Sequence, residues 1–171
     1  SQHFEQGAAM AALPAIRHGF FGRKGGSSLG AFAENNMSIT VGDKPELVEI
    51  NRSGAARALG FERDRLCLVK QVHSSRVVTL AQPPAAGDPV EADAMVTTLP
   101  GLALGILTAD CTPILLADRE AGVIGAAHAG WRGAVDAIIG NTIAAMSAQG
   151  ADPARIVAAI GPTISQENYE V

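Results

Sequence analysis

Short β-type runs, bounded by turn residues, fill the middle of the chain and restrict it to a fold with several strands. These runs cover residues 94–98, 102–108, 114–117 and 123–127. Pro100-Gly101 and the segment from Asp110 to Pro113 separate the first three of them. Because Pro113 cannot donate a hydrogen bond to a central ladder, we expect a kink or bulge around Cys111.

The flanking segments predict more strands and one helix before the central runs. The additional strands are expected at residues 16–21, 66–78 and 156–160. The helix is expected to begin with Asp43 as its N-cap, with Pro45 in the first turn, and to end near Leu59 before Gly60. Its predicted buried face is formed by Leu47, Ile50, Gly54, Ala58, Ala55 and Leu59.

A second helix is expected after the central runs, from about Trp131 to Gln149, and Gly150 should end it. Its apolar stripe at helical spacing contains Val135, Ile138, Ile139, Thr142, Ile143 and Met146. The order of elements is strands, helix, many strands, helix, strand. This order predicts an α+β layered fold rather than a strict βαβ alternation.

Size and composition indicate one globular domain. The chain has 171 residues, of which 47% are hydrophobic and 18% charged, and a formal net charge of -4. An acidic chain of this kind is unsuited to binding nucleic acid or anionic lipid, and every apolar run is shorter than the roughly 18 residues of a membrane span. We expect a cytoplasmic protein with an unstructured end at residues 1–9 and a single catalytic domain at 10–171.

Three residues of the types that bind soft metals stand at predicted strand ends or turns: His73, Cys111 and His128. One thiolate and two imidazoles would leave tetrahedral zinc a fourth position for water, as in catalytic zinc sites. Separations of 38 and 17 residues match no compact zinc motif, and an isolated histidine at a strand end is more often a polar side chain bonded to the backbone than a metal ligand. Cys67 is expected to be a buried hydrophobe, about 20 Å from His73 along one strand.

Two other segments offer weaker signals for substrate binding. The glycine-rich loop at residues 22–28, with Arg23 and Lys24, could hold an anion on its backbone amides, although a solvated turn explains it equally well. Trp131 and Arg132 could cover a planar substrate, although a sole tryptophan more often packs a helix start onto the core.

Seven segments together resemble the polyphenol oxidase, or laccase-domain, family, which includes the bacterial peptidoglycan editing factor and multifunctional purine nucleoside phosphorylases. They are Arg17-His18-Gly19-Phe20-Phe21, Gly25-Gly26-Ser27, Asn51-Arg52, Lys70-Gln71-Val72-His73, Thr108-Ala109-Asp110-Cys111, His128-Ala129-Gly130-Trp131-Arg132-Gly133 and Gly161-Pro162. The resemblance implies a four-layer α/β/β/α sandwich and a mononuclear zinc site formed by His73, Cys111 and His128. It also implies phosphorolysis of adenosine and inosine to base and ribose 1-phosphate, with adenosine deamination as a second activity.

The resemblance also suggests roles for further residues. Asp110 and Arg52 match family positions near the site, and we expect Asp110 to carry a proton or orient a ligand and Arg52 to bind an anion. The family often has Thr where Gly22 stands and Cys where Thr163 stands. Members continue for several tens of residues beyond Val171, so we expect this chain to lack a C-terminal part of the fold.

Three alternative functions fit the same residues. A His₂Cys site suits copper, which would make the protein a copper-dependent polyphenol oxidase, although four histidines are too few for a multicopper centre. Cys111 activated by a histidine would instead give a metal-free cysteine hydrolase that edits peptidoglycan precursors. In the third alternative, the metal is structural and the domain only binds a ligand. The oligomeric state is left open by the sequence.

Overall fold

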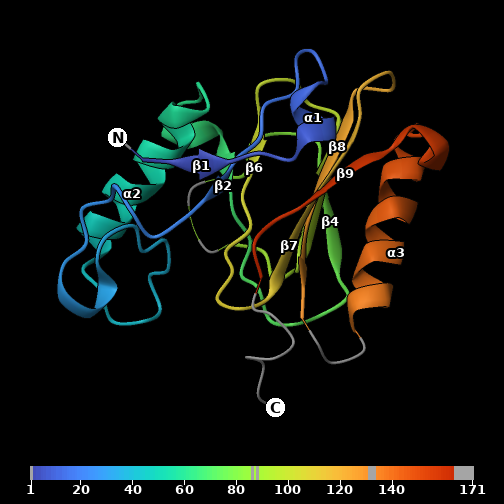
Figure 1. The fold of residues 1–171 in the computed structure, drawn as a ribbon. Helices are drawn as coiled ribbons and strands as arrows, with labels where there is room; N and C mark the ends of the chain where they lie inside the picture. Colours follow the sequence, from blue (N-terminus) through green and yellow to red (C-terminus); the bar gives the residue numbers. More distant parts are fainter. Residues whose placement is uncertain (1, 86, 88, 131–133, 164–171) are drawn as a thin grey trace.

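The computed structural model describes residues 2–85, 87, 89–130 and 134–163 (Figure 1). Its helices are α1 (Ala8–Ala11), α2 (Pro45–Ala58) and α3 (Ala134–Ala148), with 3₁₀ turns at Gly30–Phe32, Arg63–Arg65 and Pro153–Arg155. Its strands are β1 (Phe4–Glu5), β2 (Phe20–Phe21), β3 (Leu66–Cys67), β4 (Val77–Leu80), β5 (Ala94–Thr97), β6 (Ala103–Leu104), β7 (Thr112–Asp118), β8 (Val123–Ala129) and β9 (Val157–Ile160). No helix among these residues is long and apolar enough to cross a membrane.

A five-stranded mixed sheet forms the centre of the molecule, with strand order β4-β5-β8-β7-β9. Strands β4 and β5 run parallel, and the other neighbours are antiparallel. Two small sheets pair β1 with β2 and β3 with β6. The α+β class predicted from the order of elements is therefore confirmed.

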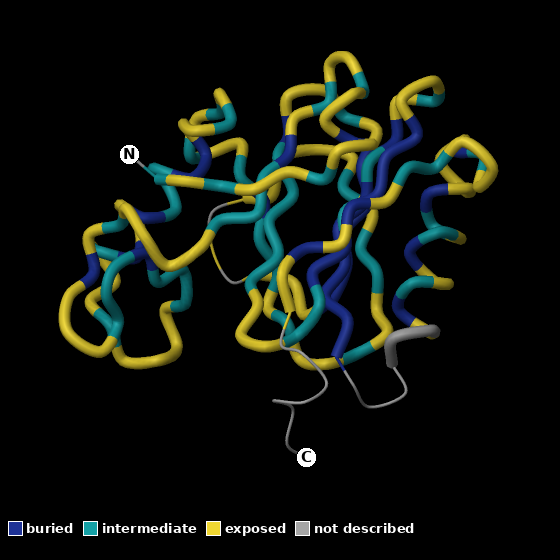
Figure 2. Tube along the Cα trace, in the orientation of Figure 1, coloured by how far each residue is buried: buried dark blue, intermediate teal, exposed yellow. Residues whose placement is uncertain are grey.

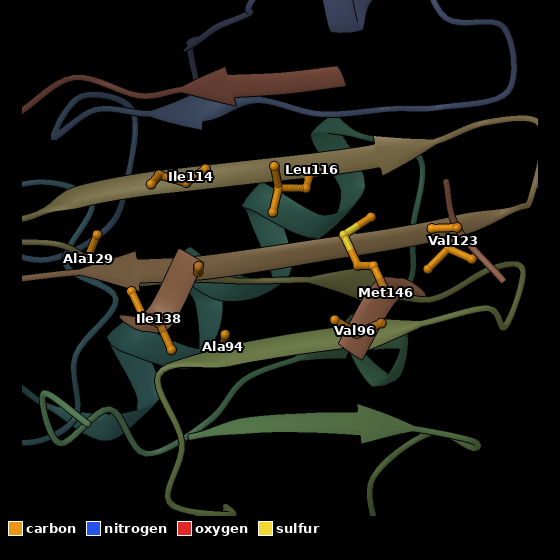
Figure 3. Close-up of a cluster of buried hydrophobic side chains, with 10 residues drawn as sticks. Ala94, Val96, Ile114, Leu116, Val123, Ala129, Ile138 and Met146 are labelled. Carbon is orange, nitrogen blue, oxygen red and sulfur yellow. The ribbon is translucent and has the colours of Figure 1, made fainter. Parts of the chain in front are cut away.

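Helix α3 covers one face of the central sheet. Alternate residues of the strands point to this face and pack against Ile138 and Met146 of the helix (Figure 3). These strand residues are Ala94, Val96, Ile114, Leu116, Val123, Ala127 and Ala129. Gly125 in β8 brings the helix close, because a Cβ at this position would lie 3.0 Å from Met146 Sδ. The stripe predicted for this helix is confirmed for its described members.

The opposite face of the sheet is covered by the N-terminal segment and the β3-β6 pair. Met10 of α1 and Phe20 of β2 pack with Ala117 and Ala159, whereas Leu102 packs with Met95 and Cys67. Figure 1 shows the successive layers, which are α2, the small sheets, the central sheet and α3. This order agrees with the α/β/β/α sandwich expected from the family resemblance.

The structure differs from the expectation of an unstructured end at residues 1–9. Phe4 and Glu5 form β1, and the Phe4 ring packs on Phe21 with the ring centroids 5.1 Å apart. The Gly7 amide donates a hydrogen bond to Nε2 of the buried His18. These contacts join residues more than ten positions apart, so no local pattern indicates them.

Helix α2 has nearly the predicted length, but the predicted buried face is only partly correct. Val48, Asn51, Ala55 and Ala56 are buried, whereas Ile50 is exposed. The cause is Asn51, whose amide accepts the Ser27 amide hydrogen and donates to Ser28 Oγ and the Asn36 carbonyl. A loop therefore covers this helix (Figure 2), and polar bonding rather than apolar patterning determines its orientation.

The predicted cap of this helix is also wrong. Asp43 does not cap it, because Lys44 occupies the N-cap position and makes no side-chain cap bond. The Asp43 carboxylate instead accepts hydrogen bonds from Ser28 and Asn36.

The expected continuous strand at residues 66–78 is wrong as well. It is broken into β3 and β4, and residues 68–76 lie outside regular strands. The expected strand at 102–108 is reduced to β6, and the one at 16–21 to β2. The runs at 94–98, 114–117, 123–127 and 156–160 correspond to β5, β7, β8 and β9.

Candidate metal centre

Four segments meet at one end of the central sheet, the lower end in Figure 1. His73 and Asp93 precede the parallel strands β4 and β5. Cys111 precedes β7, and His128 lies near the end of the antiparallel β8, opposite Pro113. Strand directions alone therefore bring these four side chains to the same edge.

The potential ligand atoms of His73, Cys111 and His128 all lie within 4.8 Å of one another. The two imidazole rings stand almost perpendicular, with their centroids 5.0 Å apart. His128 is buried and His73 is exposed, so the cluster lies at the surface end of the sheet. The three residues identified from sequence as possible metal ligands are thus close in space.

Asp93 is buried beneath both histidines. Its Oδ2 lies 2.8 Å from His128 Nδ1, and its backbone carbonyl accepts the His128 amide hydrogen at 2.7 Å. The same carboxylate accepts backbone N–H bonds from Val72, His73 and Ser74, and a further bond from Ser74 Oγ. This one side chain therefore contacts both histidine-bearing segments.

These hydrogen bonds also determine the charge of Asp93. Burial opposes its ionisation, but the bonds from His128, Ser74 and Val72 outweigh burial and lower the pKa of Asp93 to about 2. Asp93 was not among the site residues predicted from the sequence. The sequence feature that could have indicated it is a carboxylate directly before the apolar strand β5, because a carboxylate buried there needs compensating hydrogen bonds.

The bonds to Asp93 also explain why the chain leaves β3 and turns at His73. His73 has a positive φ of 59°, which is uncommon for a residue with a side chain. In this conformation three consecutive amides point at one carboxylate. Gly130 leaves room for the imidazole, because a Cβ there would lie 3.1 Å from His73 Cδ2.

Cys111 is held by the turn that precedes it. Asp110 has a φ of 70°, and its carbonyl accepts a hydrogen bond from Thr163 Oγ1, which also contacts Thr112 Oγ1 at 3.3 Å. The expected irregularity around Cys111 is thus present as this positive-φ turn. Burial, followed by the negative charges of Asp110 and Asp93, raises the pKa of the Cys111 thiol.

The donor set fits a borderline-soft metal ion. Two imidazoles and one thiolate are ligands that zinc and copper both accept. The contact between His128 Nδ1 and Asp93 leaves Nε2 free for a metal, which is the usual arrangement of a histidine ligand supported by a carboxylate. The geometry therefore supports a metal centre and leaves the identity of the ion open.

The other predicted site residues are not brought into this cluster by any described contact. Arg52 donates through Nε to the Met37 carbonyl, and burial lowers its pKa. The Arg23 side chain donates to the Ala33 carbonyl. Trp131 and Arg132 lie outside the described residues.

The glycine-rich loop makes its own hydrogen bonds. The Gly25 amide donates to the Glu34 carboxylate and the Ser28 amide to the Glu34 carbonyl. The Ser27 amide donates to Asn51. In this conformation these three amides are engaged with protein acceptors, which favours a structural turn over an anion cradle.

The fold and the cluster define an α+β protein with a His-Cys-His centre. The chain belongs to the family described as multi-copper polyphenol oxidoreductase laccase, whose model matches residues 17–171. This membership confirms the resemblance found in the motifs.

Curated enzymes and solved structures are similar to this chain. A purine nucleoside phosphorylase of Corynebacterium glutamicum is 46% identical over 157 residues, covering 91% of this chain and 64% of that protein. An adenosine deaminase, RL5, from an unknown prokaryotic organism is 40% identical over 148 residues, covering 82% and 56%. The crystal structure of YlmD from Geobacillus stearothermophilus is 30% identical with a TM-score of 0.84, covering 99% and 68%. The chain spans about three fifths of the length of these two curated relatives.

Proposed function

We propose that the protein containing this chain is a zinc-dependent purine nucleoside phosphorylase with adenosine deaminase activity. It would convert adenosine or inosine and phosphate to free base and ribose 1-phosphate. The observation that carries the proposal is the gathering of His73, Cys111 and His128 within 4.8 Å at the surface end of the sheet. The activities named for the two curated relatives support the choice of substrate.

In this proposal, His73, Cys111 and His128 hold the metal, and the exposed side of His73 faces the substrate. Bound zinc supplies a Lewis acid and an activated water at neutral pH. Asp110 lies next to Cys111 with an exposed carboxylate, which suits it to accept or return a proton. Arg52, Arg23, Trp131 and Arg132 remain proposed substrate contacts.

Copper-dependent phenol oxidation is the second candidate, favoured by the description of the family model. A multicopper centre needs many imidazoles, and this sequence has four histidines. His18 is bonded to the Gly7 amide, and His3 lies on the exposed N-terminal segment. The His₂Cys cluster is better matched to one ion than to several.

A metal-free cysteine hydrolase is the least suited alternative. A nucleophilic cysteine needs surroundings that lower its pKa, such as an adjacent cation. Cys111 instead lies near the carboxylates of Asp110 and Asp93, which raise its pKa together with burial. A bound cation would compensate for these charges.

The test measures metal content and turnover on the same preparation. Protein purified without added metal is analysed by mass spectrometry, and phosphate-dependent release of base is followed with adenosine and inosine. We expect close to one zinc per chain and turnover that a chelator abolishes. Copper in place of zinc, with oxygen-dependent phenol oxidation, would support the oxidase instead.

Cys111→Ser and Cys67→Ala form a matched pair of variants, because the chain has two cysteines. Cys67 is buried in an apolar cluster with Met95 of β5 and is not part of the candidate metal cluster. We expect Cys111→Ser to lose zinc and turnover while staying folded, and Cys67→Ala to retain both. Retention of zinc by Cys111→Ser would contradict the proposal. Hydrolysis that persists in wild type with chelator present, but is absent from Cys111→Ser, would also contradict it.

A further inference from the structure

We infer that Asp93 is a positioning residue that fixes the ring of His128 and the backbone of His73, and thereby sets the metal affinity of the centre. The part of this inference that concerns metal rests on the proposed function. The part that concerns the His128 ring does not, because the ring can be observed without metal.

The first observation is the crowding of donors around the carboxylate. Oδ1 accepts the amides of Val72 and Ser74 at 3.0 and 2.8 Å and the Ser74 hydroxyl at 2.8 Å. Oδ2 accepts the His73 amide at 3.1 Å and lies 2.8 Å from His128 Nδ1. With four other donors aimed at it, the carboxylate acts only as an acceptor, so the proton in the contact with His128 belongs to Nδ1.

This placement of the proton determines what the ring can do. A neutral imidazole has one N–H and one bare nitrogen, so a proton on Nδ1 leaves Nε2 as the lone-pair donor. His128 is 5% exposed and Asp93 is fully buried, so water does not compete for the contact. The orientation of the ring and the lone pair on Nε2 are therefore already suited to metal binding in the metal-free protein.

The second observation is that His73 is positioned by the same carboxylate through its backbone. Its amide bond to Oδ2 lies between those of Val72 and Ser74 to Oδ1. Loss of the carboxylate would release the positive-φ turn that carries the imidazole. Asp93 thus links two of the three ligands, which come from segments 55 residues apart in sequence.

The test of the ring uses metal-free wild-type protein labelled with ¹⁵N-histidine. We expect the His128 ring, assigned by the loss of its signals in His128→Gln, to carry its proton on Nδ1 at neutral pH. A ring protonated mainly on Nε2 would overturn the inference. This readout needs no zinc, so it stands even if the proposed zinc enzyme is wrong.

The test of affinity compares Asp93→Asn with Asp118→Asn. Asp118 is a matched control, because it is also fully buried and accepts backbone amides, but it lies at the opposite end of β7. We expect Asp93→Asn to bind zinc about 10- to 100-fold more weakly in competition with a chromogenic chelator, as for other carboxylates that support a metal-bound histidine. Asp118→Asn should keep the wild-type affinity.

Three further readouts separate positioning from loss of structure. Cobalt substituted into Asp93→Asn should show an altered absorption spectrum, whereas Asp118→Asn should give the wild-type spectrum. Ser74→Ala keeps the carboxylate and should retain most of the zinc affinity. Equal affinity in Asp93→Asn and wild type would overturn the inference, and absence of zinc binding in wild type would overturn only the proposed function.

Discussion

The side-chain amide of Gln71 pairs with both backbone groups of Leu107, as a neighbouring strand would. Its Nε2 donates to the Leu107 carbonyl at 2.6 Å, and its Oε1 accepts the Leu107 amide at 2.8 Å. Gln71 lies two residues before His73, and Leu107 lies four residues before Cys111. This pairing therefore connects the segments that carry two of the three candidate ligands.

Gln71→Ala should loosen the Cys111 segment. The change removes two hydrogen bonds, each contributing about 1 kcal/mol to the free energy of unfolding. We expect a loss of about 1–3 kcal/mol in denaturant unfolding and weaker zinc binding in a chelator competition assay. Gln149→Ala, at the exposed residue that follows α3, should change neither. Unaltered zinc affinity in Gln71→Ala would show that the pairing does not position Cys111.

Asn51→Ala should release the glycine-rich loop. The buried amide makes three hydrogen bonds to loop residues, and its loss leaves the Ser27 amide and the Asn36 carbonyl without these partners. We expect a loss of about 2–4 kcal/mol in the free energy of unfolding, with faster hydrogen exchange at Ser27. Ser53→Ala on the same helix provides the control. Unchanged exchange at Ser27 would argue against this role of Asn51.

Replacing Gly125 and Gly140 by alanine should change the free energy of unfolding in opposite directions, because Gly125 is packed against side chains and Gly140 faces open space. Gly125→Ala places a methyl group 3.0 Å from Met146 Sδ and 3.2 Å from Thr142 Cγ2, so we expect a loss of about 1–3 kcal/mol by overpacking. Gly140 lies in α3 with open space at its Cβ position, so Gly140→Ala should gain about 0.5–1 kcal/mol from helix propensity. Thermal and denaturant unfolding measure both. A stabilised Gly125→Ala would mean that α3 can move away from the sheet at little cost.

Acid should weaken the contacts that Asp118 makes between the end of β7 and the segment preceding β9. Hydrogen bonds from the Asp152 and Ala121 amides, and from Arg155, lower the pKa of Asp118 to about 2 from an ordinary value of 3.8. Because the folded-state pKa is the lower one, this carboxylate stabilises the fold above about pH 4 and loses its contribution as the pH falls toward 2.

The measurement is the free energy of unfolding against pH, in wild type and in Asp118→Asn. We expect the variant to be less stable at neutral pH and to show a shallower decrease between pH 4 and 2. Asp64→Asn, in an exposed 3₁₀ turn, serves as the control for removing one carboxylate. A decrease of the same steepness in Asp118→Asn and wild type would contradict the assignment.

The elements that local patterns predicted well have local causes. Pro45 and Gly60 delimit α2, and Gly150 follows α3, because these residues restrict the backbone wherever they stand. Strands β5 and β8 of the central sheet were also predictable, since their apolar runs are almost completely buried.

The errors arose where a buried polar side chain outweighed the local pattern. Asn51 turned α2 toward a loop, and Asp93 drew residues 72–74 out of the expected strand. Each contact joins residues at least 15 positions apart, so it depends on the tertiary fold. The three candidate ligands were recognisable by residue type, but Asp93 was not, because a carboxylate before a strand is commonplace until its partners are known.

The placement of His73, Asp93, Cys111 and His128 at four different strand ends has a consequence for how the centre forms during folding. No pair of adjacent strands contains the whole set, and the β4-β5 pair is joined to β7 only through β8. Contacts between such distant segments form slowly, because the chain loses the entropy of loop closure before the strand pairing that stabilises the closed loop has formed. In a refolding experiment, the rate of zinc binding would therefore report when the sheet is complete. We expect zinc binding to be slower than the recovery of the helical circular-dichroism signal from α2 and α3.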